Sequence, residues 1–119
     1  MKHFQSIQSR DKSAFDALYT GVSQEEIAQQ IESLFAREGY SIKSGELGNR
    51  TYVKGNRVLR LLLGAFYKYF EFHVGIRNAD ADNVIASVTK TTSGMSGGVI
   101  GVSQVKTELI RLESLMSEV

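Results

Sequence analysis

The segment FYKYFEFHVGIR, at positions 66–77, constrains the fold more than any other stretch of the chain. Its even-numbered positions are mostly apolar, whereas its odd-numbered positions carry mainly tyrosine, glutamate, histidine and arginine. Successive side chains of a β-strand point to opposite faces of a sheet. The segment therefore predicts a strand with one core-facing side and one outer side of half-polar, ring-bearing residues.

The clearest helix signal is the segment SQEEIAQQIESLFARE, which begins at Ser23. Ser23 is a favourable N-cap residue, and Glu26 stands three positions later, as in a capping box. Apolar residues then recur at helical spacing: Ile27, Ile31, Leu34 and Phe35. Gly39 suits the left-handed position that follows many helices. We therefore predict a helix over about 23–38.

A second helix is predicted over about 98–117, because apolar residues there step by three or four positions. These residues are Val102, Val105, Leu109, Leu112 and Met116. The glycine-rich segment TTSGMSGGVIG, at 91–101, leads into this helix. Glycine allows the start of a helix to approach a sheet closely, which is our preferred interpretation of the segment. The sequence leaves open whether residues 94–101 form a rigid turn or a hinge.

Glycines before a helix can also present backbone N–H groups to an anion. The candidate contacts for such an anion are Ser96, Gly97 and Gly98. The glycine spacing matches neither the Walker pattern nor the dinucleotide-binding pattern. A phosphate site is therefore the less favoured interpretation.

Shorter alternating segments supply the other strands. Residues 13–20 alternate as a strand, with a short helix as the rival interpretation. Residues 40–54 hold two strands joined by a hairpin, and residues 83–90 alternate again.

The predicted fold class is α+β. We expect a two-layer domain with an antiparallel sheet of about four to six strands, both helices on one face and the order β-α-β-β-β-β-α. In the alternative, a curved sheet grips the C-terminal helix. We expect residues 1–12 to form a partly ordered N-terminal tail and residues 13–119 to form one domain.

Composition excludes several classes of function. The chain has no cysteine, which rules out disulfides, thiolate catalysis, zinc–cysteine sites and iron–sulfur clusters. His3 and His73 lie far apart in the sequence and do not predict a metal site. The first residues lack the apolar core of a secretory signal, and no apolar run approaches the ~20 residues of a membrane span. We therefore expect no metal, no cofactor, no membrane span and a cytoplasmic location.

Positive charge is concentrated in residues 40–68, which hold six cations and one anion, although the whole chain carries only +1. Arg50, Lys54 and Arg57 surround the predicted hairpin and could contact phosphates of nucleic acid or another anionic surface. Basic residues also protect edge strands from pairing with other sheets. A domain devoted to nucleic acid usually has more excess charge, so nucleic acid is a disfavoured partner.

One grouping resembles a catalytic site. Glu71 and His73 lie on the same side of the predicted strand, where a carboxylate could orient an imidazole, and Tyr69 could donate a proton. On an exposed strand, however, a Glu-X-His pair more often makes ordinary cross-strand contacts. We assign no catalytic residue and expect a protein that is not an enzyme.

Our leading functional hypothesis is a small non-catalytic interaction domain that self-associates or binds a protein partner. Its contact face consists of Tyr67, Tyr69, Glu71, His73 and Arg77. Tyrosine and histidine combine an apolar body with a polar tip, which suits a surface that a partner covers. One alternative is a pocket for an apolar or anionic small molecule between the sheet and the C-terminal helix. Another is weak binding of anionic surfaces by the basic hairpin.

Overall fold

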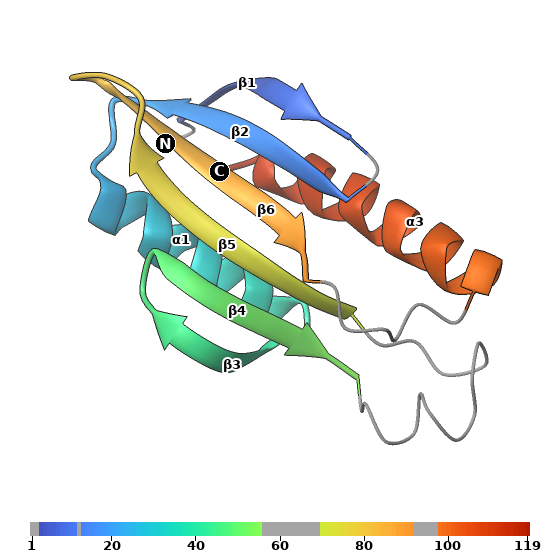
Figure 1. Cartoon of the computed structure of the whole chain (residues 1–119). Coiled ribbons are helices and arrows are strands. Elements are labelled where there is room, and N and C mark those ends of the chain that lie inside the picture. The colour runs from blue at the N-terminus through green and yellow to red at the C-terminus, as the bar shows by residue number, and fades with distance from the viewer. Residues whose placement is uncertain (1–2, 12, 56–69, 92–97) are drawn as a thin grey trace.

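The computed structural model of the protein describes residues 3–11, 13–55, 70–91 and 98–119. Strands and helices follow one another through these ranges (Figure 1). In chain order they are β1 (Phe4–Arg10), β2 (Ala14–Thr20), α1 (Gln24–Arg37), β3 (Ser41–Glu46), β4 (Asn49–Lys54), β5 (Phe70–Asn78), β6 (Asn83–Lys90) and α3 (Gly98–Met116).

The six strands form one open antiparallel sheet in the order β1-β2-β6-β5-β4-β3. Figure 1 shows α1 and α3 on the same face of this sheet, α1 behind its centre and α3 near the β1–β2 edge. The predicted α+β class, the two helices on one face and the predicted order of elements are confirmed. The rival helix at 13–20 is not formed, because that segment is strand β2.

Strand β1 lies in the segment that we expected to be a partly ordered tail. Two register shifts interrupt its pairing with β2, one between Phe4 and Ser6 and one between Ile7 and Ser9. Each shift breaks the two-residue alternation by which a strand is identified in a sequence. The beginning of β1 is also fixed to the end of the chain, because the His3 and Phe4 amides donate to the Val119 carbonyl at 2.8 and 3.0 Å.

Helix α1 begins and ends where its capping residues predict. The Ser23 hydroxyl accepts a hydrogen bond from the Glu26 amide at 3.1 Å, and this satisfies one of the N–H groups that the first helical turn leaves unpaired. Gly39 follows the C-cap residue with a φ of 91°, a conformation that costs glycine little. The chain then turns directly into β3.

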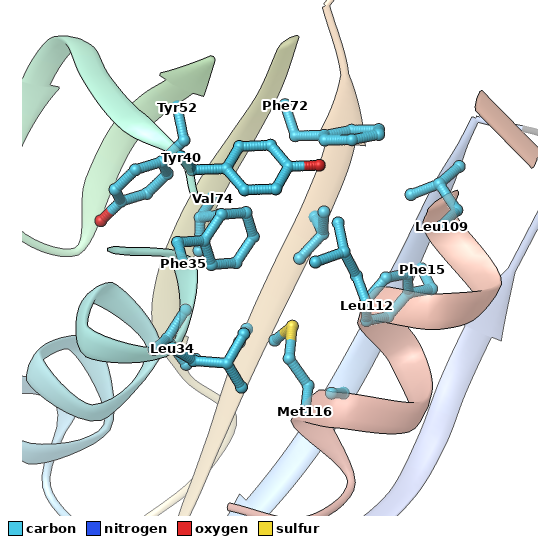
Figure 2. Close-up of a cluster of buried hydrophobic side chains, with 14 of the residues drawn as sticks. Phe15, Leu34, Phe35, Tyr40, Tyr52, Phe72, Val74, Leu109, Leu112 and Met116 are labelled. Carbon is cyan, nitrogen blue, oxygen red and sulfur yellow. The ribbon is translucent and has the colours of Figure 1, made fainter. Parts of the chain in front are cut away.

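The core lies between the sheet and the two helices. Inward residues of β2, β5 and β6 are buried beneath apolar residues of α1 and α3. Figure 2 shows Phe35 and Leu34 of α1 on one side of this cluster and Leu109, Leu112 and Met116 of α3 on the other. Burying a side chain of this size contributes about 1.5–3 kcal/mol, so the cluster is the main source of stability.

Strand β5 has the two-sided character that the sequence predicts. Phe70, Phe72 and Val74 are buried in the core, whereas Glu71 and His73 lie on the other side. Residues 66–69 of the original run are outside the described residues. Neither helix in the described part of the chain has the length and apolar character that crossing a membrane requires.

Candidate functional site

The candidate site is the outer face of the sheet, by which we mean the side opposite α1 and α3. Side chains of β2, β6, β5 and β4 form its centre. Leu18, Ile85 and Arg77 lie in one row across β2, β6 and β5, because Ile85 pairs with both of the others. In the described part of the chain, neither helix lies over this face (Figure 1).

The middle of the outer face has no large side chain at Gly75. Gly75 lies there, paired with Ser87 of β6 on one side and with Asn49 of β4 on the other. Among the described atoms, the nearest neighbour of a Cβ built at Gly75 would be His73 Nε2, at 4.0 Å. Among the described residues, side chains at this centre therefore cause little steric hindrance to a protein surface that packs on the face.

Two neighbours on β4 fix the His73 ring. Its Nε2 atom lies 2.6 Å from the Asn49 Oδ1 atom, and its Nδ1 atom lies 3.1 Å from the Thr51 hydroxyl. An amide oxygen can only accept a hydrogen bond, so Nε2 is the donor to Asn49, whereas the Thr51 hydroxyl can either donate to Nδ1 or accept from it. The imidazole is therefore held across the surface of β4.

Glu71 has other partners. Its Oε1 atom accepts a hydrogen bond from Lys43 Nζ at 2.9 Å, and its Oε2 atom accepts one from the Thr91 hydroxyl. Both ring nitrogens of His73 are engaged by β4 side chains, so Glu71 does not orient the ring. The geometry that acid–base catalysis by this pair would need is absent from these contacts.

Arg77 extends across the face toward β2. It donates from Nη1 to the Ser87 hydroxyl at 2.6 Å and from Nη2 to the Asp16 carboxylate at 3.3 Å. The Arg77 side chain is 54% exposed, so solvent screens this ion pair. The contact orients the guanidinium over β6, where a partner could reach it.

The structure thus brings together three of the five contact residues named from the sequence: Glu71, His73 and Arg77. Tyr67 and Tyr69 lie outside the described residues. Sequence reasoning missed Leu18 and Ile85, which are apolar residues at outward positions of β2 and β6. Their signal was available, because each occupies a position that alternation assigns to the outer side.

The described residues of the proposed anion-contact set lie elsewhere. The β3–β4 turn lies at Leu47 and Gly48, so Arg50 and Lys54 are along β4 rather than at the tip. Arg50 forms an ion pair with Glu32 of α1, and Lys54 Nζ lies 5.7 Å from the centroid of the Tyr40 ring. Both cations are thus engaged within the domain.

Arg57, Ser96 and Gly97 lie outside the described residues, and Gly98 is the first residue of α3. Among the described residues, no group of three or more histidine, aspartate or glutamate side chains could hold a metal ion.

One carboxylate is buried on the inner side of the sheet. Glu108 of α3 is 6% exposed, and it accepts hydrogen bonds from the Tyr40 hydroxyl at 2.5 Å and from Arg111 Nε and Nη2 at 2.9 Å each. Arg111 also forms an ion pair with Glu38. We call Tyr40, Glu108, Arg111 and Glu38 the Glu108 cluster. It connects α3 to the segment that joins α1 to β3.

Burial and hydrogen bonding have opposite effects on Glu108. Burial on its own would raise the pKa of its carboxyl group, but hydrogen bonds from Arg111 and Tyr40 and the charge of Arg111 outweigh burial and lower that pKa. For Tyr40, burial and then the bond to Glu108 both raise the pKa of the hydroxyl. At neutral pH the cluster therefore contains an ionised carboxylate and a protonated phenol.

Comparison with known proteins gives no match: no family model, no curated protein and no solved structure is significantly similar to the chain. Any functional conclusion must therefore come from the surfaces and cavities of the domain itself.

Proposed function

We propose that the chain is a non-catalytic interaction domain that binds a protein surface through the outer face of its sheet. A second copy of the chain is the partner we favour. The observation that supports this most is the position of both helices on one side of the sheet, which leaves the outward side chains of four adjacent strands without a helix among the described residues.

The composition of the outer face agrees with a protein-binding role. Leu18 and Ile85 are paired apolar residues, and Arg77 continues their row. His73 lies two residues away from the low centre at Gly75. Protein interfaces combine apolar and ring-bearing residues with arginine in this way, whereas a purely solvated sheet face is mainly polar.

Shape also favours contact between two flat surfaces. Gly75 has no side chain at the centre of the face, and Ser87 beside it is small, with the Arg77 guanidinium against its hydroxyl. Two sheets that pack face to face lie about 10 Å apart, and small central residues make such an approach easier.

The edges of the sheet are less suited to association. Register shifts interrupt β1 at two places and β3 between Ile42 and Ser44. Lys43 lies between the two residues at which the β3 register shifts. Bulges and lysine residues at a sheet edge hinder pairing with another strand, so we favour the face over the edges.

The charges of the outer face are compatible with self-association. Lys43 and Arg77 are positive, and Glu71 and Asp16 are negative. In a twofold dimer each copy presents the same surface, so a face of mixed sign avoids the repulsion that a face of one sign would cause. Arg50 and Lys54 are engaged within the domain, and we do not propose nucleic-acid binding from them.

The proposal is tested by the mass of the protein in solution. Sedimentation equilibrium of the wild-type chain over a range of concentrations should show a reversible dimer. A Gly75→Arg variant places a long charged side chain at the low centre of the outer face and should shift the protein to monomer. The matched Gly75→Ala variant adds a Cβ for which there is space and should sediment as wild type.

Circular dichroism and thermal melting of both variants show whether the fold is kept. A wild-type chain that stays monomeric at the highest soluble concentration contradicts self-association. A Gly75→Arg variant that remains folded and dimeric contradicts the choice of the outer face.

A further inference from the structure

A groove separates the β1–β2 turn from one side of α3. Its volume is about 320 Å³, at the lower end of the range typical of small-molecule sites, about 300–1,000 Å³. The lining residues are Arg10, Asp11, Ala14, Phe15, Lys106, Leu109, Ile110 and Glu113. The groove lies in the helix layer and is separate from the outer face.

The base and wall of the groove are apolar. Phe15 and Leu109, at 2% and 5% exposure, form its buried base. Ile110 is 59% exposed, which makes it the most exposed large apolar residue of the described chain. An apolar ligand that lies along this wall would remove the Ile110 side chain from water, which is favourable in proportion to the buried area.

Charged residues lie at the two ends of the α3 wall. Lys106, Ile110 and Glu113 are four and three residues apart, so they share one side of the helix. The rise of 1.5 Å per residue places Lys106 and Glu113 about 10 Å apart along its axis.

The Glu113 end is closed by an ion pair. Arg10 Nε donates to Glu113 Oε2 at 2.9 Å, and Arg10 Nη2 contacts the other carboxylate oxygen. Asp11 is held by a neutral partner, because its Oδ1 atom accepts a hydrogen bond from the Ser13 amide at 2.8 Å, and it keeps its negative charge. Three of the four charged lining residues therefore have partners.

Lys106 differs from the other charged lining residues. Within the described residues it makes no hydrogen bond and no ion pair. The groove thus has an apolar middle, an ion pair between Arg10 and Glu113, a carboxylate at Asp11 that Ser13 holds in place, and at Lys106 a cation with no ion pair among the described residues. Lys106 is therefore the lining group that can pair with a negative head group, while an apolar chain covers the middle of the groove.

We propose that the groove binds a free amphiphile of the fatty-acid class. Its carboxylate contacts Lys106, and its chain lies over Leu109 and Ile110 toward the Arg10–Glu113 ion pair. The length of about 10 Å between the two ends selects a medium-length chain rather than a long one. This site does not depend on association through the outer face.

Calorimetric titration with decanoate, below its micelle concentration, tests the proposal. Decanoate should bind saturably at one site per chain. Decyltrimethylammonium has the same chain with a cationic head, and it should bind at least about fivefold more weakly because it cannot pair with Lys106. Amide chemical shifts of Phe15, Leu109 and Ile110 should move on addition of decanoate, whereas those of β3 should not.

Three variants of α3 separate the head-group contact from the chain contact. Lys106→Gln should weaken decanoate binding by about fivefold but should not weaken binding of the ammonium compound, because the substitution removes a charge that repels a cationic head group. Ile110→Asn should lower the affinity for both ligands by about tenfold. Ser114→Asn changes an exposed residue of the same helix outside the groove, and it should bind as wild type.

Absence of saturable decanoate binding would overturn the proposal. Equal binding of the two amphiphiles, or wild-type affinity in Lys106→Gln, would overturn the assignment of the head group. Sedimentation of the chain with anionic vesicles but no response to decanoate would overturn the choice of a free ligand. The α3 variants should keep the wild-type sedimentation behaviour, so a failure at this site is distinguishable from a failure at the outer face.

Discussion

Replacing Glu108 with glutamine is expected to destabilise the domain by about 2 kcal/mol. The amide keeps the shape of the carboxylate and can still accept a hydrogen bond from the Tyr40 hydroxyl. A hydrogen bond to a charged group contributes about 1.5–3 kcal/mol and one between neutral groups about 0.5–1.5, so the Tyr40 contact weakens by about 1 kcal/mol. The amide has one oxygen where the carboxylate has two, so one of the two bonds from Arg111 is lost and the other loses its charge assistance.

The free-energy change from the weakened Arg111 contacts is smaller than for a buried pair, because solvent screens the Arg111 charge. Its side chain is 40% exposed and keeps its ion pair with Glu38, so it is not left unpaired when Glu108 becomes neutral. We therefore assign about 1 kcal/mol to this part, well below the 3–5 kcal/mol expected when one partner of a fully buried pair is removed. The sum is a decrease of about 2 kcal/mol, or about 8 °C in Tm for a domain of this size.

Urea denaturation at neutral pH and a thermal melt measure this change. Glu113→Gln is the matched control, since it makes the same chemical change on the same helix in the exposed ion pair with Arg10. Its effect should be much smaller. Equal effects of the two substitutions would refute the reasoning that burial of Glu108, rather than its pairing alone, makes the difference.

The pH dependence of the free energy of unfolding tests the direction of the Glu108 pKa shift independently. The pKa of Glu108 is lowered in the folded state, so this residue stabilises the fold above the unfolded-state pKa of about 4.3 and loses that contribution as pH falls through the folded-state pKa. Glu108→Gln lacks this contribution at every pH. The stability difference between wild type and variant should therefore shrink below about pH 4, and growth of that difference on acidification would contradict the assigned direction.

Four substitutions elsewhere in the chain test local features of the fold by urea denaturation. Gly45→Ala should lower the free energy of unfolding by more than about 1 kcal/mol, because φ is +92° and the new Cβ would lie 2.3 Å from a backbone oxygen. Gly75→Ala should leave the free energy of unfolding unchanged or raise it by about 0.5 kcal/mol. Ser23→Ala should cost about 1 kcal/mol through loss of the α1 N-cap, and an unchanged midpoint would show that the cap is dispensable. Tyr19→Phe should cost about 1–2 kcal/mol, because its hydroxyl donates to the buried Met116 carbonyl at 2.8 Å, and a wild-type midpoint would mean that water replaces the bond.

The elements that could be predicted from the sequence are those with a strong local pattern. Helix α1 has a cap at Ser23, a stop at Gly39 and an apolar stripe between them, and its bounds in the structure differ little from the prediction. Strand β5 was predictable because Phe70, Phe72 and Val74 alternate with half-polar residues. In both cases a few neighbouring residues are sufficient to determine the structure.

Strand β1 and the Glu108 cluster show the opposite case. Extra residues in β1 interrupt its alternation, so its sequence resembles a polar tail, although β2 and the last residue of the chain hold it in place. Glu108 is an ordinary helix residue by sequence, and its burial depends on Tyr40, which is distant along the chain. Partners of this kind can be identified only after the helix has been placed on the sheet.

The outer face is intermediate between these cases. Alternation alone assigns Leu18, Ile85 and Arg77 to the outer side of their strands, but it does not show that they are neighbours. Their row exists because β6 pairs with β2 on one side and with β5 on the other, and a shift of one residue in either pairing would exchange inward and outward residues. The buried faces of all three strands prevent that shift, since it would expose apolar side chains to water. The core packing that fixes the register therefore also determines which outward residues meet, so the candidate contact surface follows from the interior of the domain.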